Sequence, residues 1–171
     1  MPKYWASSSY IPRLADVKVL MSKACPRIHA EGFMRRALAL AGRGQGFVSP
    51  NPCVGAVLTR GGEILAEGHH ERWAGPHAEV ACLNEVSEDE NLQDATLFVT
   101  LEPCAHTGKT PPCADLILRR GVGQVVVAMQ DPNPLVAGRG IARLREAGVQ
   151  VQVGLLQSLA ERLNRGFIKS M

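Results

Sequence analysis

The sequence predicts an α/β protein, a three-layer αβα sandwich whose helices cover both faces of a central mixed, mostly parallel sheet. Two observations predict it. From residue 30 onward, short apolar runs typical of strands alternate with segments whose apolar residues recur at helical spacing. Such alternation favours parallel strands, because the helices that connect them bury both faces of the sheet. The 171 residues, 46% of them hydrophobic, suit one domain.

The first part of this domain is expected to hold one helix and a hairpin. Segment 30–41 carries apolar residues at helical spacing and stops at two glycines, so it predicts a helix. The apolar run 53–58 and the segment 63–68 predict two strands. Gly61 and Gly62 between them favour a tight turn, so the two strands should pair as a β-hairpin.

The remaining elements are expected to alternate in regular order. A helix over 77–86 follows Pro76, and 95–101 is a strand-forming run rich in β-branched and apolar residues. Segment 113–120 predicts a helix closed by Gly121. The chain then continues as strand 124–129, helix 137–147, strand 149–153 and helix 155–163.

Residues 1–29 are expected to be a disordered basic leader before a domain at 30–171. They carry five Lys and Arg residues and one acidic residue, whereas the whole chain has a net charge of +3. Residues 30–171 therefore sum to −1, which argues against nucleic acid as a partner. Two further interpretations of the leader stay open: a start of the natural protein at Met21, or an organelle transit peptide, which is similarly serine-bearing and poor in acidic residues.

The composition argues against several other classes of protein. No apolar stretch approaches the roughly 20 residues that cross a bilayer, so we expect no membrane partner. Aromatic residues make up only 5%, too few for a base-stacking surface. The five cysteines are an odd number, which favours reduced thiols or metal ligands over a disulfide framework. A reducing, cytoplasmic location is therefore expected.

Three residues form a natural ligand set for Zn²⁺: His77, Cys104 and Cys113. Three protein ligands leave the fourth position to water, which is the arrangement of catalytic zinc sites. Prolines before His77 and before Cys113 place both at the start of a helix, where the backbone is only becoming helical. Glu79 can then share the site with His77 and take the proton of the water. The alternative is a closed structural site with His106 as fourth ligand, which leaves Glu79 without a role.

His-x-Glu followed by Pro-Cys and a second Cys is the signature of the zinc deaminases. The segment 100–113, TLEPCAHTGKTPPC, is more specific. It resembles the deaminase half of the bifunctional pyrimidine deaminase–reductase of riboflavin biosynthesis, which has a cytidine deaminase-like fold. The same resemblance is carried by SPNP at 49–52, VGA at 54–56, MQDPNPLVAGRG at 129–140, and Leu163-Asn164 with Gly166-Phe167.

The resemblance implies a function and further site residues. Positions matching Asn51, His70 and Lys109 are expected to line the substrate pocket. The implied substrate is a small phosphorylated aminopyrimidine, 2,5-diamino-6-ribosylamino-4(3H)-pyrimidinone 5′-phosphate, which loses its 2-amino group as ammonia. We expect the reductase domain to be absent from this chain and a homo-oligomer to be its assembly.

The insert between the two cysteines predicts how a phosphate is recognised. Eight residues separate Cys104 from Cys113, where nucleic-acid-editing deaminases have two. Lys109 offers a positive charge there, and Thr110 a hydrogen-bond donor. Two alternative functions remain open at this point: a deaminase of nucleic acid, such as a tRNA adenosine deaminase, and a non-catalytic zinc-stabilised binding module.

Overall fold

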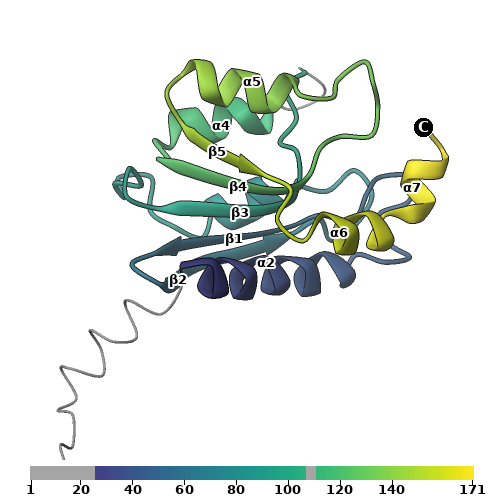
Figure 1. Ribbon diagram of the computed structural model, residues 1–171, viewed down its shortest axis with the longest axis horizontal. Coiled ribbons are helices and arrows are strands. Elements are labelled where there is room, and N and C mark those ends of the chain that lie inside the picture. The colour runs from purple at the N-terminus through teal and green to yellow at the C-terminus, as the bar shows by residue number, and fades with distance from the viewer. Residues whose placement is uncertain (1–25, 107–110) are drawn as a thin grey trace, which may run out of the picture.

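The computed structural model describes residues 26–106 and 111–171 (Figure 1). Every predicted strand and helix is present, with ends that differ by at most four residues. The strands are β1 (Gly55–Arg60), β2 (Glu63–His69), β3 (Thr96–Leu101), β4 (Gln124–Met129) and β5 (Gln150–Val153). The helices are α2 (Pro26–Gly42), α3 (Ala78–Leu83), α4 (Cys113–Arg119), α5 (Arg139–Glu146), α6 (Gln157–Leu163) and α7 (Arg165–Lys169). The sequence does not predict α7, because five residues are too few to show a helical period.

The five strands form one sheet in the order β2-β1-β3-β4-β5. β1 is antiparallel to both of its neighbours, whereas β3, β4 and β5 are parallel to one another. Four of the five strands therefore run in the same direction, and the mixed, mostly parallel sheet is confirmed. β1 runs the other way because the chain returns at once through Gly61 and Gly62, which both have positive φ.

Helices cover both faces of the sheet, so the three-layer sandwich is also confirmed (Figure 1). α2 packs against β1, β2 and β3, and α6 packs against α2 and β4 on the same face. α3, α4 and α5 lie on the other face. The buried core between the layers includes Val57, Leu97, Val99, Ile117, Val125, Val127 and Leu144. In the described part of the chain, no helix is both long and apolar enough to cross a membrane.

Two glycines on the strands let helices approach the sheet closely. A Cβ atom on Gly55 would lie 2.0 Å from the carbonyl oxygen of Ala37 in α2. A Cβ atom on Gly68 would lie 2.6 Å from the carbonyl oxygen of Ala78, the first residue of α3. The start of α3 therefore lies directly against β2, and this packing positions the candidate site.

The helix predicted over 30–41 begins four residues earlier than expected. α2 begins at Pro26, because a proline suits the first turn of a helix, where its missing N–H costs nothing. The last residues of the predicted leader are therefore helical. Residues 1–25 and 107–110 lie outside the described residues, and with them the predictions for Lys109 and Thr110.

Candidate metal centre

The first predicted ligand, His77, lies where a loop becomes a helix. It is the N-cap of α3, with extended backbone angles of φ −67° and ψ 157°. Its Nδ1 atom lies 3.2 Å from the Sγ atom of Cys113 and 3.7 Å from the Sγ atom of Cys104. Three residues from separate segments thus meet in one cluster, as the sequence predicts.

The two cysteines are held together by the start of α4. Cys113 is the first residue of this helix, and its backbone N–H donates to the Sγ atom of Cys104 at 3.2 Å. The N–H of Ala114 donates to the carbonyl oxygen of Cys104 at 3.1 Å. The extended Pro112 caps the helix and turns the chain back toward the cluster. The start of α4 therefore brings both sulfur atoms to one point, although the chain between them is long.

The electrostatics of the cluster favour a bound cation. Hydrogen bonds from the Cys113 thiol and from His77 lower the pKa of Cys104 well below its usual range. The pKa of Cys113 is raised, because its thiol donates to the Cys104 sulfur. The same sulfur raises the pKa of His77 through a hydrogen bond. A metal ion takes the place of these shared protons.

The spacing of the ligand atoms fits a tetrahedral zinc ion. The three ligand atoms all lie within 4.8 Å of one another. Zinc bonds of about 2.0–2.3 Å place tetrahedral ligands about 3.5 Å apart, close to the observed sulfur–nitrogen distances. Among the described residues, this metal-ligand cluster contains His77, Cys104 and Cys113 and does not include His106. The alternative of a closed structural site with His106 as fourth ligand is therefore not supported.

Glu79 lies beside the cluster in the first turn of α3. Its side chain is only 3% exposed, and it lines a cavity of about 220 Å³ together with His77 and Cys104. Burial raises the pKa of this carboxyl from 4.5 to about 7. A buried carboxyl with a pKa near neutrality can both accept and return a proton.

Asn51 and His70 line the same cavity. The Nε2 atom of His70 lies 3.1 Å from the Nδ2 atom of Asn51, and its Nδ1 atom lies 2.8 Å from the carbonyl oxygen of Pro76. His70 is buried, and its ring meets that of His77 edge-on at a centroid distance of 5.8 Å. These two predicted substrate-binding residues thus reach the cavity, and they are also tied to the loop before His77.

The comparisons with known proteins agree with this geometry. The family described as the cytidine and deoxycytidylate deaminase zinc-binding region matches residues 27–129. The chain belongs to this deaminase family. Zinc is therefore the metal that suits this ligand set.

The relatives of this deaminase domain include proteins of riboflavin biosynthesis. The riboflavin biosynthesis protein RibD of Escherichia coli is 53% identical over 141 residues, which are 82% of this chain and 38% of that protein. The chloroplastic riboflavin biosynthesis protein PYRD of Zea mays is 45% identical over 140 residues, 81% of this chain and 35% of that protein. The chain thus spans less than two fifths of the length of these relatives.

Solved structures show the same relationship. A diaminohydroxyphosphoribosylaminopyrimidine deaminase/5-amino-6-(5-phosphoribosylamino)uracil reductase from Thermotoga maritima is 46% identical, with a TM-score of 0.79. The match covers 84% of this chain and 41% of that one. RibD of Acinetobacter baumannii is 45% identical with a TM-score of 0.80, covering 85% of this chain and 40% of that one. These likenesses confirm the cytidine deaminase-like fold predicted from the sequence.

Glu102 is a residue of the deaminase site whose role the sequence did not indicate. Its carboxylate is 5% exposed and accepts four backbone hydrogen bonds of 2.9–3.3 Å. The donors are Asp131, Gly138, Gly140 and Ile141. Glu102 thus joins the segment before Cys104 to the start of α5. The one signal in the sequence is a charged residue directly after a buried strand.

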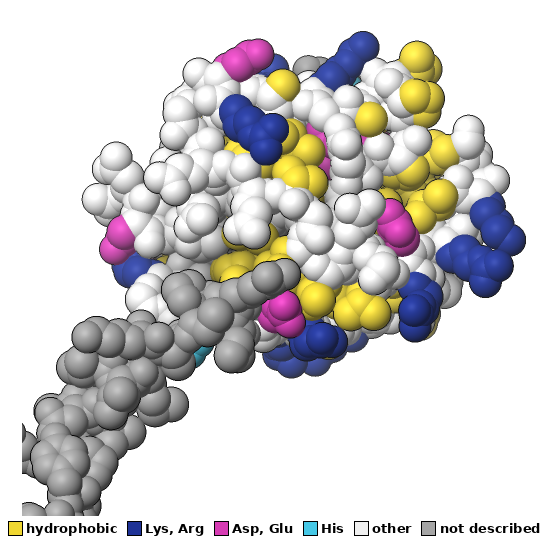
Figure 2. All heavy atoms as spheres, in the orientation of Figure 1, with side chains coloured by type: hydrophobic (Ala, Val, Ile, Leu, Met, Phe, Trp, Pro, Cys, Tyr) yellow, Lys and Arg dark blue, Asp and Glu magenta, His cyan; other side chains and the backbone are white. Residues whose placement is uncertain are grey.

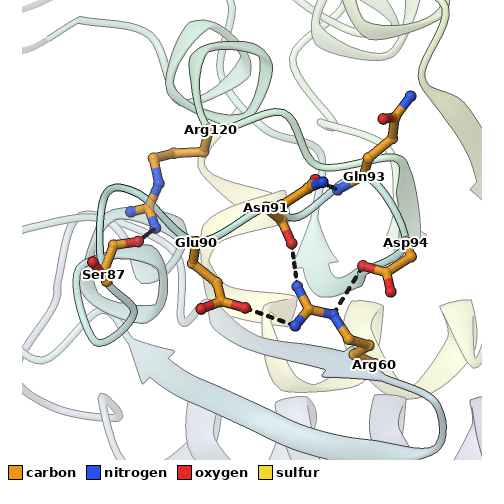
Figure 3. A network of polar contacts seen from close by, with 7 residues as sticks. All are labelled: Arg60, Ser87, Glu90, Asn91, Gln93, Asp94 and Arg120. Atoms are coloured by element: carbon orange, nitrogen blue, oxygen red, sulfur yellow. Dashed lines mark hydrogen bonds and ion pairs between the residues drawn. The ribbon is translucent and has the colours of Figure 1, made fainter.

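Two arginines secure the ends of α4 and β1 that lie away from the cluster. Arg120, after α4, donates to the carbonyl oxygen of Ser87 at 2.8 Å, beyond the end of α3 (Figure 3). It also donates to the carbonyl oxygen of Val86 at 3.1 Å. Arg60, at the end of β1, binds Glu90 at 2.7 Å and Asp94 at 2.8 Å (Figure 3). The two helices that bear His77 and Cys113 at their starts are therefore tied together at their ends.

Proposed function

We propose that this deaminase domain hydrolyses 2,5-diamino-6-ribosylamino-4(3H)-pyrimidinone 5′-phosphate, releasing ammonia and leaving the 5-amino-pyrimidinedione. The observation that carries the proposal is the identity of 53% to a riboflavin biosynthesis protein over 141 residues. It is supported by a cavity that places the buried Glu79 carboxyl beside His77 and Cys104.

The proposed mechanism assigns the movement of protons to Glu79. His77, Cys104 and Cys113 would hold the zinc ion, which supplies a Lewis acid that lowers the pKa of water. Glu79 accepts a proton from the attacking water and delivers it to a ring nitrogen. Glu79 then takes the remaining proton of the former water molecule and transfers it to the departing amine. The carbon–nitrogen bond to the 2-amino group breaks, a carbon–oxygen bond replaces it, and ammonia leaves. The pKa of about 7 suits a group that must accept and donate protons in turn.

Asn51 and His70 are proposed to orient the pyrimidine ring. Asn51 uses one hydrogen of its amide group for the contact with His70. The other amide hydrogen and the side-chain carbonyl oxygen take no part in that contact. A side-chain amide with both a donor and an acceptor can recognise the donor and acceptor edge of a pyrimidine.

Lys109 and Thr110 are proposed to bind the 5′-phosphate, on the strength of the sequence alone. A charge-assisted contact of this kind contributes about 1.5–3 kcal/mol, or about one to two powers of ten in kcat/KM. Lys109→Ala should therefore lower kcat/KM by that factor with the phosphorylated compound and leave the dephosphorylated compound almost unaffected. Equal losses on both would exclude a phosphate contact.

The decisive experiment measures ammonia release from the zinc-loaded protein. The phosphorylated aminopyrimidine should be turned over, whereas cytidine and a tRNA anticodon stem should not. Glu79→Gln, which keeps its shape and cannot shuttle protons, should retain zinc while turnover falls by about 10²–10⁴. Turnover of the tRNA substrate alone would overturn the proposal in favour of a nucleic-acid deaminase, and no turnover of any of them would favour a binding module.

A nucleic-acid substrate is the second candidate, because a solved structure from studies of A-to-I editing by tRNA:A34 deaminases is 28% identical to this chain, with a TM-score of 0.62. The charge distribution does not favour it for this chain. Figure 2 shows basic side chains in separate groups over the described part of one face, with acidic side chains between them. The described part of this face thus lacks the basic stripe expected of nucleic-acid binding.

Two further predictions from the sequence remain proposals. They are the assembly into a homo-oligomer and the cytoplasmic location. The plant relative from Zea mays is named as chloroplastic, which keeps the organelle interpretation of residues 1–29 open to a localisation experiment.

A further inference from the structure

One wall of the cavity comes from outside the region that the deaminase family shares. That region matches residues 27–129. Among the described residues that line the cavity, Asp131 and Phe167 lie beyond it. Phe167 belongs to α7, near the end of the chain. A wall supplied by this segment can distinguish the substrate of this protein from those of other family members.

The segment that carries Phe167 is anchored next to the cavity. The side-chain amide of Asn164 accepts from the backbone N–H of Cys53 at 2.8 Å and donates to its carbonyl oxygen at 2.9 Å. Asn164 is 3% exposed, so both bonds are shielded from water. Cys53 is two residues after Asn51, which lines the cavity. The same contact therefore holds the loop of Asn51 and the start of α7 in a fixed relation.

Phe167 itself faces the cavity instead of the core. Leu163 packs on the buried cluster of Ala41, Val48 and Cys53, and Ile168 packs against the main core. Phe167, between them, is half-buried and, among the described residues, belongs to neither apolar cluster. Leu163 and Ile168 are half-buried as well, but each packs on an apolar cluster, whereas Phe167 lines the cavity. Its place in the cavity wall calls for another partner.

The chemistry of the cavity indicates what that partner is. Polar groups of Asn51, Glu79 and His77 line the cavity, whereas Phe167 adds a flat apolar surface. A planar pyrimidine ring presents a polar edge and two apolar faces, which match these two kinds of surface. We infer that Phe167 packs against the pyrimidine ring of the substrate and determines substrate specificity, with Asn164 as the positioning residue that holds it there. This inference rests on the proposed function.

The test compares KM, kcat and zinc content across variants. Phe167→Ala should raise KM for the phosphorylated aminopyrimidine about tenfold, because a contact between aromatic rings is lost, while kcat stays within about twofold. Phe167→Tyr keeps the flat surface and should stay within about threefold of the parent in KM. Phe47→Ala is the matched control, because Phe47 is 68% exposed and is not among the residues that line the cavity. It should leave KM and kcat unchanged.

Asn164→Ala tests the positioning role separately. It should raise KM about as much as Phe167→Ala and keep a full zinc content, although its unfolding temperature falls. The double variant with Asn164→Ala and Phe167→Ala should have a KM no higher than that of either single variant, because both substitutions act through the ring of Phe167. A fall in stability with an unchanged KM would show that Asn164 is only structural, and would overturn its part of the inference.

A binding measurement separates this inference from the proposed function. Zinc-loaded Glu79→Gln protein should bind the same compound in calorimetry, and adding Phe167→Ala should raise Kd about tenfold. If the parent turns the compound over and Phe167→Ala leaves both KM and Kd unchanged, the inference is wrong and the function stands. The Glu79→Gln protein could bind the compound, with a Kd that rises on adding Phe167→Ala, while the parent releases no ammonia. In that case the proposed function is wrong and the inferred contact of Phe167 with the ring stands. No binding and no turnover would overturn both.

Discussion

His70 donates a hydrogen bond from Nδ1 to the carbonyl oxygen of Pro76, at 2.8 Å. A carbonyl oxygen can only accept, so the proton of the imidazole lies on Nδ1, and Nε2 accepts from the Asn51 amide at 3.1 Å. The carbonyl of Pro76 belongs to the peptide group that leads into His77. His70 therefore fixes, through the backbone, the residue that supplies the nitrogen of the metal centre.

Replacing His70 should weaken zinc binding without removing a ligand. His70→Phe fills the same space and loses both hydrogen bonds, so His77 is less well oriented. Loss of such a supporting contact typically lowers metal affinity about 10–100-fold. Competition with a zinc chelator measures the change. His69→Phe, at the neighbouring position, is the control and should bind zinc as the parent does; equal affinities for both variants would show that His70 does not support the site.

The ligand assignment predicts the effect of removing a thiolate. Cys113→Ser should lose bound zinc, because a serine hydroxyl is a poor replacement for a thiolate on this metal. Cys82 is also a buried thiol, and it lies outside the metal-ligand cluster. Cys82→Ala should keep one zinc ion per chain. Metal analysis of the purified proteins decides the matter, and a full zinc content in Cys113→Ser would refute the assignment.

Glu79 should lower the stability of the metal-free protein at high pH. Burial raises its folded-state pKa from 4.5 to about 7, so folding favours the protonated form. Ionisation of Glu79 therefore lowers the free energy of unfolding as the pH rises from 4.5 through 7, and this loss is complete above pH 7. With zinc chelated, Glu79→Gln should raise the free energy of unfolding by about 3 kcal/mol at pH 8 and by far less at pH 5. Urea denaturation at both pH values tests this, and a gain independent of pH would contradict it.

Glu102 should be important for stability, because four backbone N–H groups depend on its carboxylate. Glu102→Gln places an amide NH₂ group among donors, so at least one buried N–H loses its acceptor. The expected loss in free energy of unfolding is about 2–3 kcal/mol. The control is Glu90→Gln, in a partly exposed ion pair with Arg60, which should cost at most about 1 kcal/mol. Similar losses in both variants would rule out a special role for Glu102.

Ala74 is a residue whose replacement should stabilise the protein. It has a φ of +59° and an exposed side chain, three residues before His77. A left-handed conformation costs a non-glycine residue roughly 1–2 kcal/mol, so Ala74→Gly should gain about 0.5–1 kcal/mol after the entropy of glycine is subtracted. Ala39→Gly, at an exposed position within α2, should instead lose about 1 kcal/mol. Thermal unfolding of the two variants should show shifts of opposite sign, and a loss in both would show that Ala74 is not strained.

Local patterns in the sequence determined most of the fold and the metal ligands. The strand and helix periods, the Gly61-Gly62 turn and the prolines before His77 and Cys113 act over a few residues, so they can be read without knowing the rest of the chain. The cluster of His77, Cys104 and Cys113 could be predicted because a zinc ion demands particular side chains in a small space, whereas the catalytic role of Glu79 stays a proposal. The phosphate-binding role of Lys109 and Thr110 stays a prediction.

The tertiary structure alone decided which single polar residues support the site. Glu102 and Asn164 lie in segments that carry the family resemblance, but nothing near them in the sequence indicates which groups they contact. Asn164 contacts a backbone 111 residues earlier, and Glu102 binds donors 29 to 39 residues later. Such contacts depend on the order of the strands in the sheet and on how closely α7 packs against the loop of Cys53. A buried polar group must find partners wherever the fold brings them, so its role is set by packing between distant segments and not by its neighbours along the chain.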